Sequence, residues 1–323
     1  MTRFVKVFFI ATLAVLCACS PFTVGIASTA YPEKPVEVVV AFAPGGGTDA
    51  AARLVFKYAQ KYFPQNFAII NKPGAAGEIG FTSIAQSKAD GYTIGFINPP
   101  TILLHPIQRE GCRYTLDDFE PIANIVMDPG VIAVKKDSKY TTLKELFDAA
   151  KAKKKAVSIG YSGPGTSEAM TLKKLERMNE MELNKIPFEG SAPSVVALLG
   201  GHVDAVCMNI SEAYTQVEEG NIKLLGVGST IRDATLKDVP TYKEQGFDLI
   251  QVALRGVAAP KGIPAEAKAK IEQAIAMTMQ DPEFVQKTKE MQMPLHYMGS
   301  EEYTQFLNSM NNDLQNEWTN SPW

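Results

Sequence analysis

The 323-residue sequence contains few of the side chains that most often carry out catalysis or bind metal ions. It has 3 His and 4 Cys residues, and no spacing between them suits a zinc site. His105 and His296 lie close to prolines in loop-like stretches, and His202 lies in a glycine-rich turn, so we expect packing or surface roles for them. These shortages predict a protein that is not an enzyme and binds no metal ion or cofactor.

The chain also lacks an excess of positive charge. It has 32 Lys and Arg residues against 35 Asp and Glu residues, a formal net charge of −3. The one lysine-rich run, 151–155, lies at the end of a helix-like segment, where cations interact favourably with the helix dipole. Because there is no basic stripe, nucleic acid is not expected as a partner.

Long apolar runs are absent except close to the N-terminus. Arg3 and Lys6 precede an apolar run at 8–19, which is too short to span a bilayer but is typical of the hydrophobic region of a secretory signal. We therefore expect residues 1–30 to be a signal peptide and the protein to be exported. It would then be periplasmic, or lipid-anchored on the outside of the cytoplasmic membrane.

Two routes for processing this leader remain open. The stretch 16–19, Leu-Cys-Ala-Cys, resembles a lipoprotein box with Cys19 as the acylated residue. The stretch 28–30, Ser-Thr-Ala, offers small residues for ordinary cleavage before Tyr31. The first route predicts a lipid anchor on Cys19, and the second predicts a free N-terminus at Tyr31.

From Tyr31 onward the sequence alternates between strand-like and helix-like segments. The first half predicts strands and helices in the order 36–41, 48–62, 67–71, 78–87 and 93–97. The second half repeats this alternation at 157–161, 167–179, 182–187, 193–199, 205–208, 212–219 and 224–227. Strands that alternate with helices predict an α/β fold, with parallel sheets covered on both faces.

Two extended segments connect the two halves. They lie at 122–134 and 250–259, and neither has the composition of a loose Gly/Ser linker. Two crossings make the first domain discontinuous. We therefore expect one domain of residues 31–124 plus 252–323 and a second domain of residues 125–251.

Three glycine-rich turns stand between a strand and a helix. They read "APGGGTDAA", "NKPGAAGE" and "SGPGTSEA", and the first and third share a hydroxyl residue placed to cap a helix and an acid in its first turn. Open α/β sheets bind ligands at the carboxyl ends of their strands, and helix N-termini can hold an anion without Lys or Arg. The turns therefore predict a site for a small anion, and a reversibly bound organic acid fits a neutral site best.

The same turns do not fit the enzymes that they superficially suggest. A dinucleotide site needs an acid at the end of the second strand, but that strand ends in Asn71, Lys72 and Pro73. A P-loop needs Lys followed by Ser or Thr after the glycines, and neither pair is present there. The stretch 160–164 nearly matches the nucleophile elbow of hydrolases, but Pro164 occupies a position that requires glycine.

Longer motifs carry a resemblance to a known family. In order along the chain they are "YPEKPVEVVVAFAPGGGTDAAAR", "NKPGAAGEIG", "ADGYTIGF", "SGPGTSEAM", "PFEGSAPSVVALLGGHVDAVCMN", "DVPTYKEQGF" and "RGVAAPKGIPAEAKAKI". Over nearly all of the chain that follows the leader, the sequence resembles the extracytoplasmic substrate-binding proteins of tripartite tricarboxylate transporters, also called Bug-type receptors. The resemblance implies a two-domain periplasmic-binding-protein fold, type II-like, with two crossing strands and a central ligand cleft.

The resemblance also implies which residues contact the ligand. In this family the first two glycine loops hold a ligand carboxylate, largely through backbone amides and ordered water, and the other domain completes the site. The matching positions of the first domain are Phe42, Gly46, Gly47, Thr48, Asp49, Ala75, Ala76 and Gly77. The matching positions across the cleft are Ser162, Thr166, Ser167, Gly190, Ser191 and Asn209.

Several of these residues have an alternative structural role. Thr48, Thr166 and Ser167 are also placed to cap helices, and Phe42 is also suited to the hydrophobic core. Asp49 either points away from the ligand or pairs with a cationic part of it, which would suit an amino acid.

Three further positions bear on the ligand. Arg255, in the second crossing segment, is either structural or makes a bidentate contact with a ligand carboxylate. The sequence departs from common family members at Glu189 and Met208, so the ligand does not follow from relatives.

The resemblance implies an extracytoplasmic receptor that acts without a catalytic step. It would act as a monomer that captures a small organic acid or amino acid and delivers it to the large and small membrane subunits of a tripartite transporter. The alternative is a sensing module, in which the same ligand-bound receptor docks on a signalling partner.

Overall fold

The computed structural model describes residues 31–232, 236–320 and 322 of the chain. The expected signal peptide, with Cys19, lies outside the described residues. No helix in the part that is described is both long enough and apolar enough to cross a membrane.

The first half of the chain folds around three parallel strands, with β1 between β2 and β3. The central strand, β1, is a run of valines in which only Glu37 is exposed, as is typical of a strand covered on both faces. The elements are β1 Val36–Val40, α1 Gly47–Ala59, β2 Phe67–Asn71, α2 Glu78–Ala85, β3 Thr93–Ile97 and α3 Thr101–Gln108.

The second half repeats this arrangement with β5 between β6 and β7, again all parallel. Its elements are α4 Leu143–Ala152, β5 Ser158–Tyr161, α5 Ser167–Asn179, β6 Asn184–Pro187, α6 Ser191–Leu199, β7 Ala205–Asn209, α7 Ile210–Glu218 and β8 Ile222–Val227. The strands and helices predicted from the alternating pattern are therefore confirmed, with ends that differ by a few residues.

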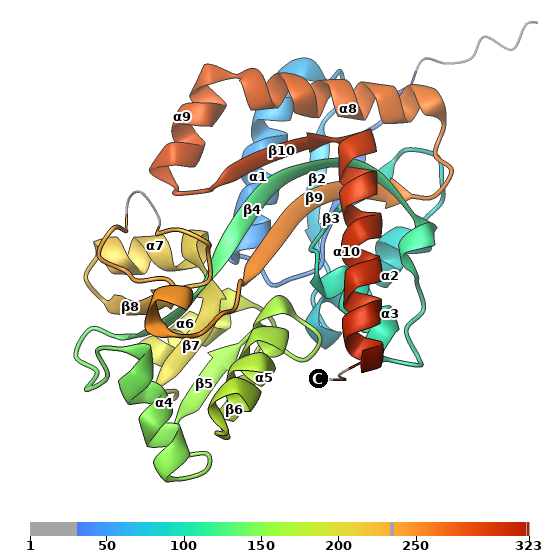
Figure 1. The fold of residues 1–323 in the computed structure, drawn as a ribbon. Helices are drawn as coiled ribbons and strands as arrows, with labels where there is room; N and C mark the ends of the chain where they lie inside the picture. Colours follow the sequence, from blue (N-terminus) through green and yellow to red (C-terminus); the bar gives the residue numbers. More distant parts are fainter. Residues whose placement is uncertain (1–30, 233–235, 321, 323) are drawn as a thin grey trace, which may run out of the picture. The chain divides into compact units, whose positions relative to one another are not determined.

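Two long strands, β4 Phe119–Lys135 and β9 Val252–Pro260, run side by side between these halves (Figure 1). Residues 119–129 of β4 pair with β9, whereas residues 130–135 pair with β7 and β8. One strand thus belongs to both sheets, and the two predicted crossing segments are confirmed. The parallel strands predicted for each half are confirmed, and the crossing strands add antiparallel pairs, because β4, β8, β9 and β10 all pair antiparallel.

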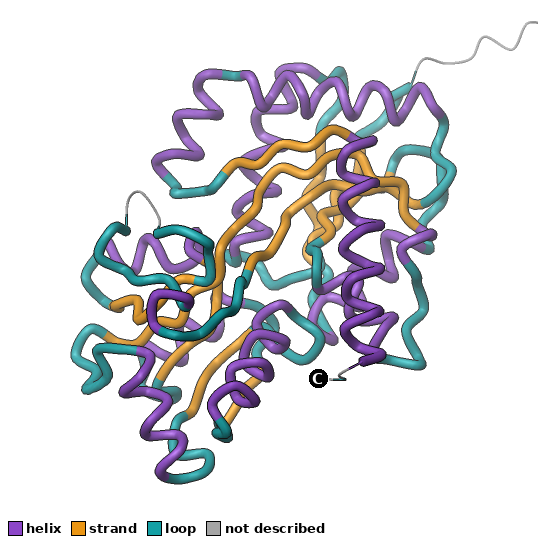
Figure 2. Tube along the Cα trace, viewed as in Figure 1, coloured by secondary structure: helices purple, strands orange, loops and turns teal. Residues whose placement is uncertain are grey.

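The C-terminal part packs back on the first half. It comprises α8 Ala265–Gln280, α9 Pro282–Glu290, β10 Leu295–Gly299 and α10 Ser300–Asn320, and β10 pairs with β4. Figure 2 shows helices lying along both sides of the strands. Short 3-10 helices complete the structure at Gln60–Tyr62, Ala75–Gly77, Leu116–Asp118 and Lys243–Gln245.

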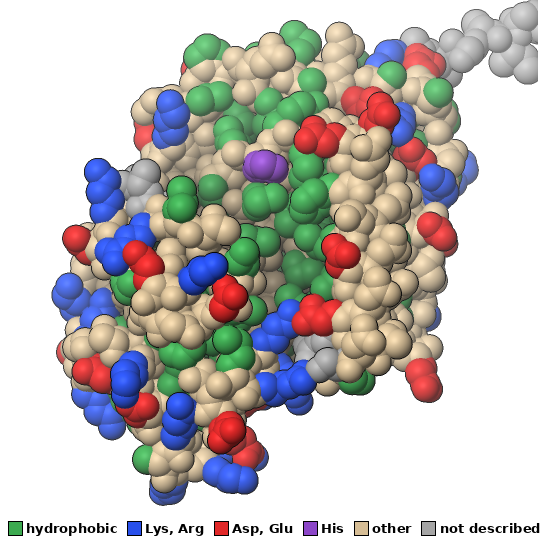
Figure 3. Space-filling model, viewed as in Figure 1, with side chains coloured by type: hydrophobic (Ala, Val, Ile, Leu, Met, Phe, Trp, Pro, Cys, Tyr) green, Lys and Arg blue, Asp and Glu red, His purple; other side chains and the backbone are tan. Residues whose placement is uncertain are grey.

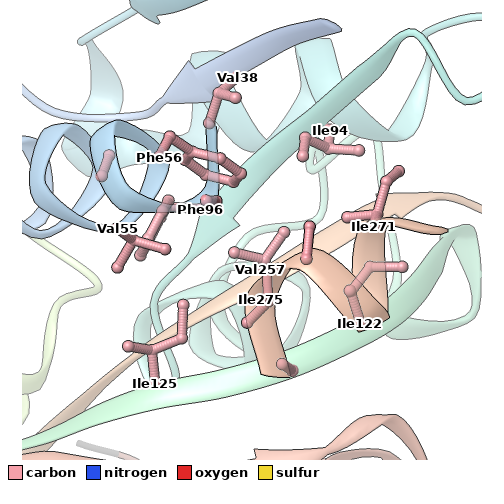
Figure 4. Close-up of a cluster of buried hydrophobic side chains, with 14 of the residues drawn as sticks. Val38, Val55, Phe56, Ile94, Phe96, Ile122, Ile125, Val257, Ile271 and Ile275 are labelled. Carbon is pink, nitrogen blue, oxygen red and sulfur yellow. The ribbon is translucent and has the colours of Figure 1, made fainter. Parts of the chain in front are cut away.

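The buried apolar side chains form four clusters that divide at the crossing strands. Two clusters draw their buried residues from before residue 127 and after residue 253. The other two draw theirs from residues 131–247. In Figure 4, Val55 and Phe56 of α1 lie near Val257 of β9 and Ile275 of α8. We call residues 31–129 with 252–320 lobe 1, and the described part of residues 130–251 lobe 2.

His105 corrects one sequence interpretation. It lies inside α3 rather than in a loop, fully buried, with Nδ1 3.0 Å from the Tyr114 hydroxyl. Burial and the nearby Arg109 charge lower the pKa of His105 to about 3, so the imidazole is neutral. It is a packing residue, as expected.

Candidate ligand-binding site

A cavity of about 30 Å³ lies where lobe 1 meets lobe 2. Of the fourteen residues predicted to contact the ligand, ten line it: Phe42, Gly46, Gly47, Thr48, Ser162, Thr166, Ser167, Gly190, Ser191 and Asn209. The cavity is also lined by five residues for which the sequence predicted no ligand contact: Asn98, Thr101, Glu168, Glu212 and Ala253. Arg255, for which a ligand contact was one of two expected roles, lines it as well.

In the described part of the chain, five helices begin at this cavity. Residues of their first turns or N-caps line it, namely Gly47 of α1, Thr101 of α3, Ser167 of α5, Ser191 of α6 and Asn209 of α7. The first N–H groups of a helix have no partner within the helix and carry a partial positive charge. The cavity wall is therefore suited to an anion even though Arg255 is the only basic residue among the described residues that line it.

Asp49 is turned away from the cavity. One of its carboxylate oxygens accepts hydrogen bonds from the Gly45 amide at 2.9 Å and from Arg53 Nε at 3.0 Å, and the other accepts one from Asn71 Nδ2 at 2.9 Å. Burial raises the pKa of Asp49, but the bonds from Arg53, Gly45 and Asn71 outweigh burial and hold it below its usual value. Of the two alternatives considered for Asp49, the structure shows the one in which it points away, and there it anchors the first glycine turn.

The three hydroxyl residues differ in their contacts. Thr166 caps α5, because its Oγ1 accepts a hydrogen bond from the Ala169 amide at 3.2 Å. Thr48 Oγ1 instead accepts one from Asn98 Nδ2 at 2.8 Å, and Ser167 Oγ donates to Glu168 at 3.2 Å. The capping interpretation therefore applies to Thr166 but not to the other two.

Phe42 both packs and lines the cavity. Its ring meets Phe81 edge to face, with ring centroids 6.1 Å apart, and it lies against a core cluster of lobe 1. Phe42 therefore packs as a core residue, and its contact with a ligand stays a prediction.

The second glycine turn lies outside this cavity. Ala75 and Ala76 have φ values of 51° and 59°, and they line a separate pocket of about 490 Å³ that also contains Gly163 and Pro164. Arg109 joins the two lobes here, since it donates to the carbonyls of Ala75 and Pro164. Gly77 lines neither pocket, and a Cβ at Gly77 would meet the rings of Phe42 and Phe81.

Arg255 holds a buried ionic cluster on the wall of the cavity. Only 1% of its side chain is exposed, and it pairs with Asp128 and, through Nη2 at 3.2 Å, with Glu212 Oε1. Burial lowers the pKa of Arg255, but the charges of Asp128 and Glu212 raise it above its usual value. The guanidinium is thus permanently charged and is already held by two carboxylates of the protein.

Glu212 connects the two lobes. Its Oε1 accepts the Gly47 amide of α1 at 3.3 Å, and its Oε2 accepts the Asn209 amide at 2.9 Å. A carboxylate of lobe 2 therefore lies at the N-terminus of a lobe 1 helix, where helix dipoles favour negative charge. The sequence held a signal for Glu212, because it stands three residues after Asn209 in the spacing of a capping box.

Glu168 is the second carboxylate on the cavity wall. It lies in the first turn of α5 and is buried, and burial together with the Glu212 charge raises its pKa to about 7. Sequence reasoning noted an acid at this position of the third glycine turn but did not place it in the site.

Charged residues of both signs are interspersed on the face of the molecule shown in Figure 3. Among the described residues, no group of His, Cys, Asp and Glu could hold a metal ion.

Residues 51–316 match the family model TctC, described as "Tripartite tricarboxylate transporter family receptor". The UPF0065 protein in the gbd 5' region of Cupriavidus necator is 30% identical over 276 residues, which cover 85% of this chain and 84% of that protein. Protein BugT of Bordetella pertussis is 28% identical over 256 residues, 78% of each chain.

Solved structures show the same architecture. Periplasmic binding protein BugD matches with a TM-score of 0.85 and 28% identity, over 90% of this chain and 98% of its own. MatC from Rhodopseudomonas palustris, with bound malate, has a TM-score of 0.82 and 25% identity, over 88% of this chain and 99% of its own. A second R. palustris protein, with adipate, has a TM-score of 0.83 and 25% identity, over 90% of this chain and 97% of its own. The predicted periplasmic-binding-protein fold is thereby confirmed.

Proposed function

Because the chain belongs to the family of tripartite tricarboxylate transporter receptors, whose members are solute-binding receptors rather than enzymes, we propose that it captures a small carboxylate and delivers it to a transporter of that type. Receptors of similar fold hold malate and adipate, which supports a small organic acid as the class of ligand.

The observation that carries this proposal is the convergence of five helix N-termini on one small cavity, among the described residues. The first-turn amides and the hydroxyls of Thr48, Ser162 and Ser191 supply hydrogen-bond donors for a carboxylate without a free basic side chain. We assign the ligand to the residues that line this cavity.

Capture requires the lobes to move. A cavity of about 30 Å³ is small beside the ~300–1,000 Å³ of typical small-molecule pockets. The lobes also touch beside it, since the Ala43 amide donates to the Glu189 carbonyl at 3.3 Å and the Gly47 amide donates to Glu212. We infer that the two lobes correspond to two domains, residues 31–124 plus 252–323 and residues 125–251, which open along β4 and β9 to admit the ligand.

Thermal shift with a panel of mono- and dicarboxylates and amino acids tests the function directly. A ligand at 100 times its dissociation constant stabilises the folded protein by ~2.7 kcal/mol, which a thermal melt resolves. Stabilisation by none of the acids, with citrate, malate, adipate and the amino acids all included, would contradict the proposal.

The proposed function also requires that the protein is exported and that it delivers its ligand to a transporter in the membrane. An exported receptor, periplasmic or tethered through Cys19, can reach the large and small membrane subunits of a transporter. Mass spectrometry of the processed N-terminus distinguishes a diacylglyceryl mass on Cys19 from a chain that starts at Tyr31. Uptake of the stabilising acid by cells with and without the intact gene tests delivery, and unchanged uptake would leave the sensing alternative.

A further inference from the structure

The cavity wall holds more negative charge than a purely carboxylate ligand would favour. Glu168 and Glu212 line it, and Asp128 lies directly behind Arg255. Among the described residues, Arg255 is the only cation that pairs with members of this group, and it is shared by Asp128 and Glu212. The group therefore carries excess negative charge whenever Glu168 is ionised.

The two glutamates on the wall are not equivalent. Glu212 accepts hydrogen bonds from the Gly47 and Asn209 amides and pairs with Arg255, so its carboxylate is well satisfied. Glu168 accepts a hydrogen bond from the hydroxyl of its neighbour Ser167, and no basic side chain in the described residues pairs with it. A buried carboxylate without a cationic partner is unfavourable unless a ligand supplies one.

A second acceptor on the wall also lacks a donor. Asn98 lines the cavity, and its Nδ2 donates to Thr48 Oγ1 at 2.8 Å and to the Leu254 carbonyl at 3.4 Å. These bonds fix the orientation of the amide and leave Asn98 Oδ1 buried, with no donor among the described residues. The wall thus offers a carboxylate without a cationic partner and an amide oxygen without a donor, and a ligand group that donates hydrogen bonds suits both.

We propose that the ligand carries a protonated amine as well as its carboxylate, and that Glu168 accepts the amine. This inference rests on the proposed function, because it assumes that the helix N-termini at the cavity hold the carboxylate. Glu168 then selects an amino acid over the corresponding acid without nitrogen, since the ammonium group restores the charge balance of the wall and the acid alone adds to the repulsion.

A protonated Glu168 that donates to a second ligand carboxylate predicts the opposite behaviour. In that case Gln at position 168, which can also donate, preserves binding, and affinity falls as the pH rises. If Glu168 accepts an amine, Gln at this position removes the charge, and affinity rises with pH as Glu168 ionises. The groups that act on Glu168 electrostatically are Glu212 of α7, Arg255 of β9, Cys207 of β7 and Tyr242.

The experiment is isothermal titration of the full mature chain with matched pairs of ligands. The pairs are aspartate and succinate, glutamate and glutarate, and alanine and propionate, each titrated at pH 6, 7 and 8. The wild type, Glu168→Gln and the control Glu266→Gln are compared. Glu266 occupies the same second position of its helix, α8, but is exposed and pairs with Lys270.

The wild type is expected to bind the amino member of at least one pair at least tenfold more tightly, with affinity that rises from pH 6 to pH 8. Glu168→Gln is expected to lose at least tenfold of that affinity and most of the pH dependence, while Glu266→Gln matches the wild type. Circular dichroism melts confirm that each variant is folded.

Two results overturn this inference alone. One is tighter binding of the acid without nitrogen, and the other is unchanged amino acid affinity in folded Glu168→Gln. If no member of any pair binds, and the wider acid panel also gives no stabilisation, the proposed function fails as well.

Discussion

The first and third glycine turns have nearly the same sequence but use their acids in different ways. In lobe 1, Asp49 lies in the first turn of α1, and Arg53, four residues later, pairs with it at 3.0 Å. In lobe 2, the residue four positions after Glu168 is Leu172, which is buried and apolar. The same motif therefore gives an anchored acid in one lobe and an uncompensated acid in the other.

The neighbouring strands strengthen this difference. The strand beside β1 ends in Asn71, whose amide donates to Asp49 at 2.9 Å. The strand beside β5 ends in Pro187, which has no side-chain donor. The role of an acid in such a turn therefore depends on the residue four positions later and on the last residue of the adjacent strand.

The largest effect should follow removal of Arg255, a residue of lobe 1 that pairs with Glu212 of lobe 2. We expect Arg255→Met to destabilise the protein by about 3–5 kcal/mol, because Asp128 and Glu212 would remain in the interior without their cation. Urea denaturation measures this change. A loss below about 1 kcal/mol would show that the cluster does not depend on its arginine.

Glu168 itself should make stability depend on pH in the opposite sense to Asp49. Its pKa is about 7 in the folded protein and 4.5 in the unfolded chain, so the unfolded state loses its proton first and stability falls as the pH rises through 7. We expect a loss of up to about 3 kcal/mol between pH 4.5 and pH 7, measured by denaturation.

Glu168→Gln is expected to remove this pH dependence. The pKa of Asp49 is lowered, so its contribution is present above its usual pKa and is lost as the pH falls through its folded value. The raised pKa of Glu168 would be contradicted if the free energy of unfolding of the wild type increased between pH 5 and pH 7 relative to that of Glu168→Gln.

Local sequence patterns predicted most of the strands and helices, but they did not predict the ionic cluster of Arg255, Asp128 and Glu212. The strands at 67–71 and 93–97 were predicted to the residue, since apolar runs there are bounded by turn residues. Helix α3 was missed because it contains Pro106, which normally indicates a helix end. The helix α9 and the strand β10 were not predicted either.

Ten of the cavity residues were predicted from the family resemblance, and six of these lie in the first and third glycine turns, which are local features of the sequence. The contact between Glu212 and Arg255 was not predictable in the same way. The two residues lie 43 positions apart on elements of different lobes, and only the fold brings them together.

A smaller effect is expected at Gly47, where lobe 1 touches the ionic cluster. A Cβ at this position would overlap Arg255 Nη2 and lie 2.8 Å from the Glu212 carboxylate, so one of them must shift. We expect Gly47→Ala to weaken ligand binding about tenfold, or ~1.4 kcal/mol. Gly111→Ala is the control, because nothing lies within 4 Å of its added Cβ. The affinities are measured by titration with the acid that stabilises the protein most. Equal affinities for the two variants would show that the ligand does not bind at the N-terminus of α1.

The smallest effect should come from the partner that distinguishes the two turns. Arg53 is 53% exposed, and exposed ion pairs contribute ~0.2–1 kcal/mol, so Arg53→Ala should destabilise the protein by no more than that. Asp49 keeps its bonds from the Gly45 and Asn71 amides in this variant, so the first turn should hold its shape and ligand affinity should be unchanged.

The double variant Arg53→Ala with Asn71→Ala leaves Asp49 only the bond from the Gly45 amide, so Asp49 then lacks a cationic partner, as Glu168 does. We expect the free energy of unfolding of the double variant to fall less steeply on acidification than that of the wild type, because the pKa of Asp49 would no longer be lowered by Arg53 and Asn71. An unchanged pH dependence would show that the bond from the Gly45 amide alone lowers the pKa of Asp49.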